Sequence, residues 1–340
     1  MLYILFVLIA LLLLVGRNVW CHGDSDLKDF NIAETLPLRG LLAIGVMLTH
    51  LCPHLVSEAP LLDDFGLWGP PSVASFFLLT GYGLSVSYMK KGEGYLHGFF
   101  KKRLLRLLWP LLLMTIVFQG YKIFMGIFNF TSLLCEPSPM TWFIYALLIW
   151  YVGFYVSFKI GKNRKQRLSL IWLFTMLYVI LVVGCGMTYY YISILPLPMA
   201  ITYVYYENKT KAWIVRNSRS VWWCVLFFVL LVMGYSVAGQ YGANLPGWGL
   251  PVNILAPWVL VYVTYCLGGW KNRVTNFLGK ISYEFYIVHG FVVMLLGDVH
   301  LFSLDGYANA FCVMTLILVI TVLFAWLMNL VCTRINVVIK

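Results

Sequence analysis

Charged residues are scarce in this 340-residue sequence. Asp, Glu, Lys and Arg make up 11% of it, whereas the hydrophobic types make up 61% and the mean hydropathy is +0.85. An ordinary soluble domain is about 25% charged. A water-soluble fold of this length could not bury so much apolar surface, so the sequence predicts that lipid surrounds most of the chain.

Metal-binding and redox patterns are also lacking. The eight cysteines are scattered, with no C-x-x-C pair and no histidines at zinc spacing, and are interpreted as small apolar residues in helices. A disulfide between Cys52 and Cys135 is left open. His50 and His54 have a metal-binding spacing, but Pro53 intervenes and no convergent carboxylate accompanies them. We therefore predict no metal site.

No internal repeat, low-complexity linker or appended soluble domain is detectable in the sequence. We divide the chain into an N-terminal hydrophobic segment and loop, 1–37, and one membrane domain, 38–334. The segment 2–15 lacks the basic region that precedes the apolar run of a signal peptide. It is interpreted as an additional span, with a leader as the alternative. Any chemistry then occurs within the helix bundle or at its edges.

Apolar runs long enough to cross a bilayer as helices recur along the membrane domain. The predicted fold class is therefore all-α, a polytopic bundle of ten core transmembrane helices plus the possible N-terminal one. The ten runs lie near residues 38–56, 70–89, 107–125, 140–158, 168–186, 189–206, 221–238, 251–268, 281–297 and 307–331.

The loops that connect the ten predicted runs alternate between basic and acidic along the sequence. Basic residues cluster in 90–106, 159–167, 207–219, 269–280 and the C-terminal tail, whereas the opposite loops are acidic. The positive-inside rule then predicts a multi-pass protein of the plasma or inner membrane, with Arg39 and the C-terminus in the cytoplasm. Because the net charge of +11 is distributed in this way, it does not indicate nucleic-acid binding.

An ionisable ring interrupts the first of the ten runs. Arg39 and His50 are eleven positions apart in "LRGLLAIGVMLTH", which is about 16 Å of helical rise. With Arg39 at the cytoplasmic edge, His50 lies near the middle of the hydrocarbon core, where an ionisable residue indicates a functional site. The alternative is a neutral imidazole that is hydrogen-bonded in a helix interface.

A basic cluster opens the third run. In "FFKKRLLRLLWP", Arg103 and Arg106 are three residues apart and share one helix face. Arginine suits bidentate phosphate recognition. The alternative is that these residues only flank a span, as basic residues do in many membrane proteins.

Two further stretches carry polar residues inside runs. In "SFFLLTGYGLSVSY", Gly81 and Gly83 are expected to break the spanning helix around Tyr82, for close approach of a ligand or only of another helix. In "LGKISYEFYIVHGF", Glu284 lies near the cytoplasmic end of a span, where it could pair with an arginine or orient a histidine. His289 lies deeper in the same span.

Together these stretches resemble the acyltransferase-3 family of integral membrane O-acyltransferases. The resemblance covers about residues 38–331. Its matching residues occur in the family's order: Arg39 and His50, "SFFLLTG" at 75–81, Arg103 and Arg106 followed by Pro110, Trp142 with Phe143, and "LGKISYEFYIVH" from Leu278 to His289. The departures are the segment 1–37, Thr80 in place of a serine, and Glu284 within the last motif.

The resemblance implies transfer of an acyl group, acetyl in the simplest case, from cytoplasmic acyl-CoA to a hydroxyl of a surface glycan or a lipid-linked sugar. Acyl-CoA is then a donor substrate, and no bound cofactor is expected. Arg103 and Arg106, with Arg39, are expected to hold the phosphates of coenzyme A.

His50 is expected to act as a general base, which requires a neutral imidazole. His289 is expected either to replace it as base or to polarise the carbonyl, and Glu284 is the third catalytic candidate. Tyr82 and Trp142 are expected to contact the substrate, and Trp68 and Trp248 are weaker candidates for sugar stacking.

Two rival functions fit part of the pattern. A secondary transporter also has many spans, broken helices and intramembrane ionisable residues, but the sequence shows no repeat symmetry. A glycan polymerase or ligase is the other rival, and its usual large outer loops are absent here. The sequence does not predict the oligomeric state.

Overall fold

A computed structural model describes residues 32–135, 138–217, 220–227, 249–267, 272–297 and 301–338. Within these ranges the chain is helical and contains no strand, as predicted. The segment 2–15, favoured above as an additional span, lies outside the described residues.

Six helices in the described ranges are long and apolar enough to cross a membrane. They are α2 (Ile32–Leu55), α3 (Gly69–Lys91), α4 (Phe99–Phe124), α6 (Trp142–Ile160), α7 (Arg164–Gly184) and α14 (Gly306–Val338). A bent pair, α12 (Arg273–Lys280) and α13 (Ser282–Leu296), makes a seventh span if its two parts are counted together, with 75° between them. The chain is therefore a multi-pass helical membrane protein.

The predicted count of ten spans is not confirmed. Helices α9 (Pro196–Arg216) and α11 (Gly249–Leu267) occupy two of the remaining predicted runs, but neither qualifies as a span. The second half of α9 carries charged residues, including Glu207, Lys209 and Lys211, which lower its hydropathy. Most of the predicted run 221–238 lies outside the described residues.

Several helices begin at sequence signals for helix starts. Prolines occupy the first turns of α3 and α9, where their missing N–H groups leave no bond unmade. Asn163 caps α7 by accepting the backbone N–H of Gln166 at 3.0 Å, and a capping box between Asn272 and Thr275 opens α12. Short elements complete the connections: η1 (Pro60–Trp68), η2 (Gly92–Tyr95), α5 (Phe130–Cys135) and α8 (Thr188–Ile192).

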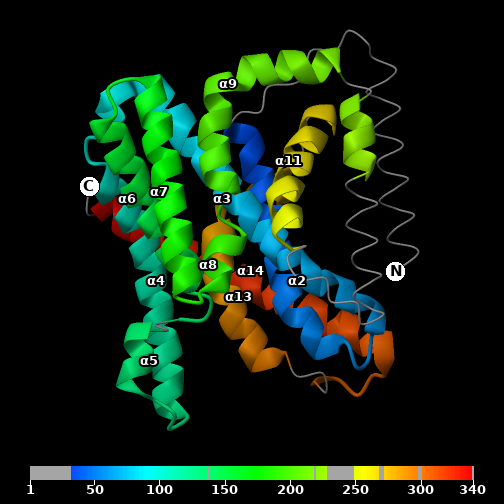
Figure 1. Cartoon of the computed structure of the whole chain (residues 1–340). Coiled ribbons are helices and arrows are strands. Elements are labelled where there is room, and N and C mark those ends of the chain that lie inside the picture. The colour runs from blue at the N-terminus through cyan, green and yellow to red at the C-terminus, as the bar shows by residue number, and fades with distance from the viewer. Residues whose placement is uncertain are drawn as a thin grey trace.

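Helix α2 is central to the packing, since it contacts α3, α12, α13 and η1. Figure 1 shows α6 and α7 as neighbouring helices on the opposite side of the bundle from α11. Glycine permits the closest crossing of α2. A Cβ atom added to Gly279 of α12 would lie 1.9 Å from the carbonyl oxygen of Leu36. The α2–α12 contact therefore depends on the absence of a side chain at this position.

The bundle has two ends, the η1 end and the η2 end, each called after the short helix near it. At the η1 end, the Ser193 hydroxyl donates to the carbonyl of Pro70 at 3.1 Å, and the Asn309 amide donates to Glu58 at 2.8 Å. The opposite end, the η2 end, holds the start of α4 and the contact of α12 with α2. The end of α2 and the starts of α3, α9 and α14 therefore lie near the η1 end. This is expected for helices that cross the bundle in alternating directions.

The expected break in α3 is wrong, because this helix is continuous from Gly69 to Lys91. A Cβ atom at Gly81 would lie 2.3 Å from the carbonyl oxygen of Leu197, at the start of α9. Gly81 therefore serves close helix packing. A Cβ atom at Gly83 would meet nothing within 4 Å.

These two glycines give opposite expectations for alanine substitution. The methyl group added in Gly81→Ala pushes the backbone of α3 away from the backbone of α9. This variant is expected to destabilise the fold by about 1–3 kcal/mol. Gly83→Ala is expected to be neutral, or stabilising by up to about 1 kcal/mol, because alanine has the higher helix propensity. Thermal unfolding in detergent compares the two variants. A melting temperature that falls equally for both would contradict the packing role of Gly81.

Candidate active site

The structure brings together two of the predicted catalytic residues. His50 on α2 and His289 on α13 have ring centroids 5.4 Å apart, with 32° between the ring planes. His289 is fully buried, whereas His50 is half-buried. Because these helices are far apart in the sequence and pack side by side, two separate sequence motifs contribute to one location.

The ring of His289 is held on one side by its own helix. Its Nδ1 atom lies 2.6 Å from the carbonyl oxygen of Tyr286, and its ring lies parallel to that of Phe285 at 6.5 Å. Its Nε2 atom is buried and has no hydrogen-bond partner among the described residues. A buried polar atom without a partner is uncommon in a folded protein and calls for an explanation, of which a catalytic role is one.

The three predicted arginines also come together, at the η2 end. Arg39 on α2 lies within electrostatic range of both Arg103 and Arg106 on α4. None of the three forms an ion pair with a carboxylate in the part of the chain that the structure describes. Like charges gathered at a helix bundle's edge make a site that favours a polyanion.

Tyrosines fix the central arginine of this group. The Arg103 guanidinium donates to the Tyr95 hydroxyl and also bonds with the Tyr151 hydroxyl. It lies 5.9 Å from the centroid of the Tyr95 ring and 5.6 Å from that of Tyr151, within range of a cation–π contact. A guanidinium carries five N–H donors, so Arg103 retains donors for a ligand.

Glu284 lies with the arginines instead of the histidines. It is buried, accepts a hydrogen bond from the Asn329 amide at 3.0 Å, and is within electrostatic range of Arg106. Five residues separate Glu284 from His289, which turns the two side chains about 140° apart around the helix. Of the two roles considered above, the position fits pairing with an arginine.

The arginine cluster and the histidine pair are linked through α2. Eleven residues are close to three helical turns, so Arg39 and His50 leave α2 on the same face, about 16 Å apart along its axis. The Tyr283 hydroxyl donates to the carbonyl of Leu107 at 2.8 Å and joins α13 to α4 next to Glu284 and Arg106. The arginine cluster and the histidine pair therefore lie along one face of α2.

The two predicted substrate contacts, Tyr82 and Trp142, lie in different parts of the structure. Tyr82 is buried in an apolar cluster that includes Leu38 and Leu42, and no ring contact joins it to the histidines among the described residues. Trp142 begins α6 and lies at 5.8 Å from the ring of Tyr190. From Trp142, ring contacts run through Phe143 and Tyr286 to His289 at separations of 6.3, 5.0 and 5.5 Å.

The weaker candidates can also be located in part. Trp68 is exposed and packs on Phe65 at 5.3 Å, whereas Trp248 lies outside the described residues. Cys52 is a free, buried thiol, so the disulfide left open above is not formed. The described residues contain no group of three or more His, Cys, Asp or Glu side chains that could hold a metal ion.

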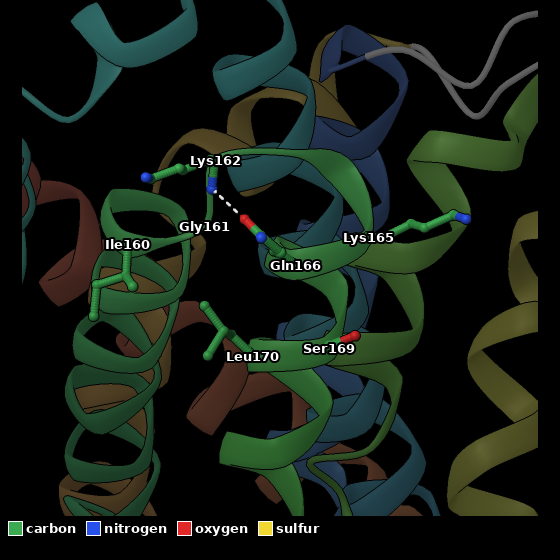
Figure 2. Close-up of a pocket in the computed structure, with 7 residues that line it drawn as sticks. All are labelled: Ile160, Gly161, Lys162, Lys165, Gln166, Ser169 and Leu170. Atoms are coloured by element: carbon green, nitrogen blue, oxygen red, sulfur yellow. Dashed lines mark hydrogen bonds between the residues drawn. The ribbon is translucent and has the colours of Figure 1, made fainter.

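Two surface cavities lie away from both groups. One, of about 500 Å³, occupies the corner between α6 and α7, where the Gln166 side chain accepts the backbone N–H of Lys162 at 2.9 Å (Figure 2). The other, of about 520 Å³, is an apolar cavity between α9, residues 220–227 and α11. Neither is lined by a predicted catalytic residue.

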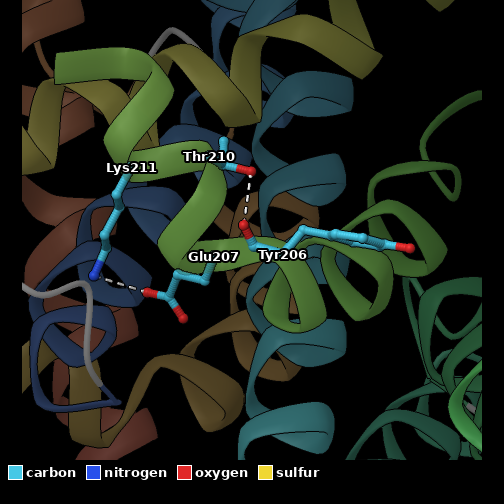
Figure 3. A network of polar contacts seen from close by, with 4 residues as sticks. All are labelled: Tyr206, Glu207, Thr210 and Lys211. Atoms are coloured by element: carbon cyan, nitrogen blue, oxygen red, sulfur yellow. Dashed lines mark hydrogen bonds and ion pairs between the residues drawn. The ribbon is translucent and has the colours of Figure 1, made fainter. Parts of the chain in front are cut away.

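The ion pair on α9 is local. Lys211 lies 3.0 Å from Glu207, one turn away, and the Thr210 hydroxyl donates to the carbonyl of Tyr206 at 3.1 Å (Figure 3). Contacts one turn apart support a helix and give no indication of a ligand.

The sequence alone missed Tyr95, Tyr151, Tyr283 and Asn329 around the arginine cluster. Tyrosines are abundant in this chain, numbering 22, and many lie at helix ends where aromatic residues are common in any membrane protein. Asn329 is the one signal that could have been noticed, since it is a polar amide within the most hydrophobic run.

Comparison with known proteins gives one match. A family model described as an acyltransferase domain (acyltransferase 3) matches residues 38–330. No curated protein matches, and no solved structure does. The matched region contains both histidines, all three arginines and Glu284, and spans most of the chain, so this protein belongs to the acyltransferase 3 family of membrane acyltransferases.

Proposed function

We propose that this protein transfers an acyl group, acetyl in the simplest case, from cytoplasmic acyl-CoA to a hydroxyl of a surface glycan or a lipid-linked sugar. The observation that supports it is the arrangement of an arginine cluster and a histidine pair along one face of α2. The acyltransferase family supplies the reaction class. In this proposal the η2 end faces the cytoplasm of the plasma or inner membrane, as does the C-terminus.

The donor binds by its phosphates. Coenzyme A is a phosphate-rich anion, and Arg103 and Arg106 contact it through charge-assisted hydrogen bonds, with Arg39 beside them. Arg103 is oriented for this by Tyr95 and Tyr151. Glu284 offsets part of the positive charge of Arg106, which lies within its electrostatic range. The pantetheine arm then carries the thioester along α2 toward His50.

The transfer step uses His50 as general base. The acceptor oxygen attacks the thioester carbonyl carbon, and its proton moves to the neutral ring of His50. A C–O bond forms, the C–S bond breaks, and the coenzyme A thiolate leaves. The proton held by His50 then passes to this thiolate. Trp142 supplies a stacking surface for the acceptor sugar at the start of α6, and Tyr82 shapes the apolar wall near the donor.

Acetyl-CoA binding tests the proposal without knowledge of the acceptor. The purified protein in detergent is titrated with acetyl-CoA by calorimetry, and acetyl-dephospho-CoA serves as the control that lacks only the 3′-phosphate. We expect saturable binding that weakens by at least about tenfold for acetyl-dephospho-CoA. Absence of binding up to millimolar acetyl-CoA would contradict the proposal and favour the transporter alternative, to be tested by substrate uptake in vesicles.

A further inference from the structure

We infer that His289 is a positioning residue, whose Nε2 atom accepts the N–H of His50 and thereby leaves the other ring nitrogen of His50 bare toward the acceptor hydroxyl. The kinetic consequence rests on the proposed function. The arrangement of the two rings stands on the contacts of α2 and α13 alone.

The contact of His289 with its own helix determines which of its ring nitrogens carries the proton. Its Nδ1 atom lies 2.6 Å from the carbonyl oxygen of Tyr286, and a carbonyl oxygen only accepts hydrogen bonds. A hydrogen bond at one imidazole nitrogen decides which nitrogen carries the proton. The neutral ring of His289 therefore has its proton on Nδ1, and Nε2 is a bare acceptor.

The Nε2 atom of His289 needs a hydrogen-bond donor. Nε2 of His289 is buried without a partner in the described part of the chain, and a buried acceptor left unpaired is destabilising. The neighbouring ring of His50 can supply an N–H. At a centroid separation of 5.4 Å the bond is not made in this structure, but rotation of the His50 ring so that its edge faces Nε2 would bring the two nitrogens to about one hydrogen-bond length. Catalytic hydrogen bonds are often long before substrate binds and tighten in the complex.

The two histidine rings differ in exposure, and this determines their roles. His289 is fully buried, so a substrate hydroxyl cannot reach it without a large rearrangement. His50 is half-buried and is the accessible member of the pair. His50 therefore meets the acceptor, and His289 acts through it.

The arrangement also stabilises the charged intermediate state of the pair. When His50 takes the acceptor's proton, its ring becomes an imidazolium. The bond from its other N–H to Nε2 of His289 is then charge-assisted and stronger than before. The charge stays on His50, because His289 is the fully buried ring and burial disfavours a charged imidazole there. The proton taken from the acceptor then passes from His50 to the coenzyme A thiolate.

Nitrogen NMR tests the arrangement directly. The full-length protein is labelled with ¹⁵N-histidine and studied in detergent, and the His289 signals are assigned by their loss in His289→Gln. We expect a protonated Nδ1 and a bare Nε2, whose resonance moves downfield in His50→Ala because its donor is lost. A proton on Nε2, or an Nε2 resonance unchanged in His50→Ala, would overturn the inference.

Kinetics test the consequence. His289→Leu is expected to lower kcat by about 10²-fold through misplacement of His50, with KM for acetyl-CoA unchanged. His289→Gln keeps an acceptor oxygen and is expected to recover most of this loss. In the His50→Ala background, His289→Leu should cause no further loss, since it acts through an absent ring. An equal loss in both backgrounds would assign His289 a structural role and overturn the inference.

The two proposals fail in different ways. A wild-type protein that gives the expected NMR signals but transfers no acyl group refutes the proposed function and leaves the arrangement of the rings standing. A protein that transfers acyl groups but shows Nε2 of His289 protonated refutes only the inference.

Discussion

Replacing His50 with alanine is expected to lower the rate of acyl transfer by about 10²–10⁴-fold, the range for loss of a general base. Acetyl-CoA affinity is expected to stay within about twofold of wild type, because the arginine cluster lies about 16 Å away along α2. Binding by calorimetry and transfer of labelled acetyl groups to the envelope glycan fraction measure the two quantities separately.

His54 provides a matched control on the same helix. It lies one turn after His50 and is exposed at the η1 end, where a Cβ atom added to Gly297 would lie 3.4 Å from its ring. His54→Ala removes the same kind of ring and is expected to leave both rate and affinity near wild type. A His50→Ala variant that transfers acyl groups at the wild-type rate would remove His50 from the mechanism, whatever the result for His54.

Local patterns predicted the parts of the site that depend on one helix. The spacing of Arg39 and His50 places both on one face of α2, since eleven residues are close to three turns. Arg103 and Arg106 lie one turn apart on α4 in the same way. Such periodicity is a property of a single segment, so it can be deduced without knowledge of the fold.

The contacts between helices could not be deduced in this way. The pairing of His50 with His289 depends on α2 packing against α13, which is determined by the whole bundle. The bond from Asn329 of α14 to Glu284 has the same origin. The glycine pattern misled for a related reason. Gly81 can serve a break or a close crossing, and the position of Leu197 decides between them.

Replacing both Arg103 and Arg106 with alanine is expected to weaken acetyl-CoA binding by at least about tenfold, or 1.4 kcal/mol. Hydrogen bonds to charged groups contribute about 1.5–3 kcal/mol each, so the loss can reach 10²-fold or more. Calorimetry at fixed ionic strength measures it. His50→Ala, measured beside it, should bind normally.

The matched control is the double variant Lys101→Ala and Lys102→Ala. It removes an equal number of positive charges from the first turn of α4, beside the arginines, where both lysines are exposed. If only the general positive charge of this end attracts acetyl-CoA, the lysine variant will bind as poorly as the arginine variant. If the two guanidinium groups contact the phosphates, the lysine variant will bind nearly as well as wild type.

Single variants separate folding from binding within the arginine pair. Arg103 bonds with Tyr95 and Tyr151, so its loss also frees two hydroxyls and is expected to lower the melting temperature. Arg106 is exposed and makes no such bond to a described residue. Arg106→Ala should therefore weaken binding without loss of stability. Wild-type affinity in this variant would exclude Arg106 from the donor site and leave Arg39 and Arg103 to hold the phosphates.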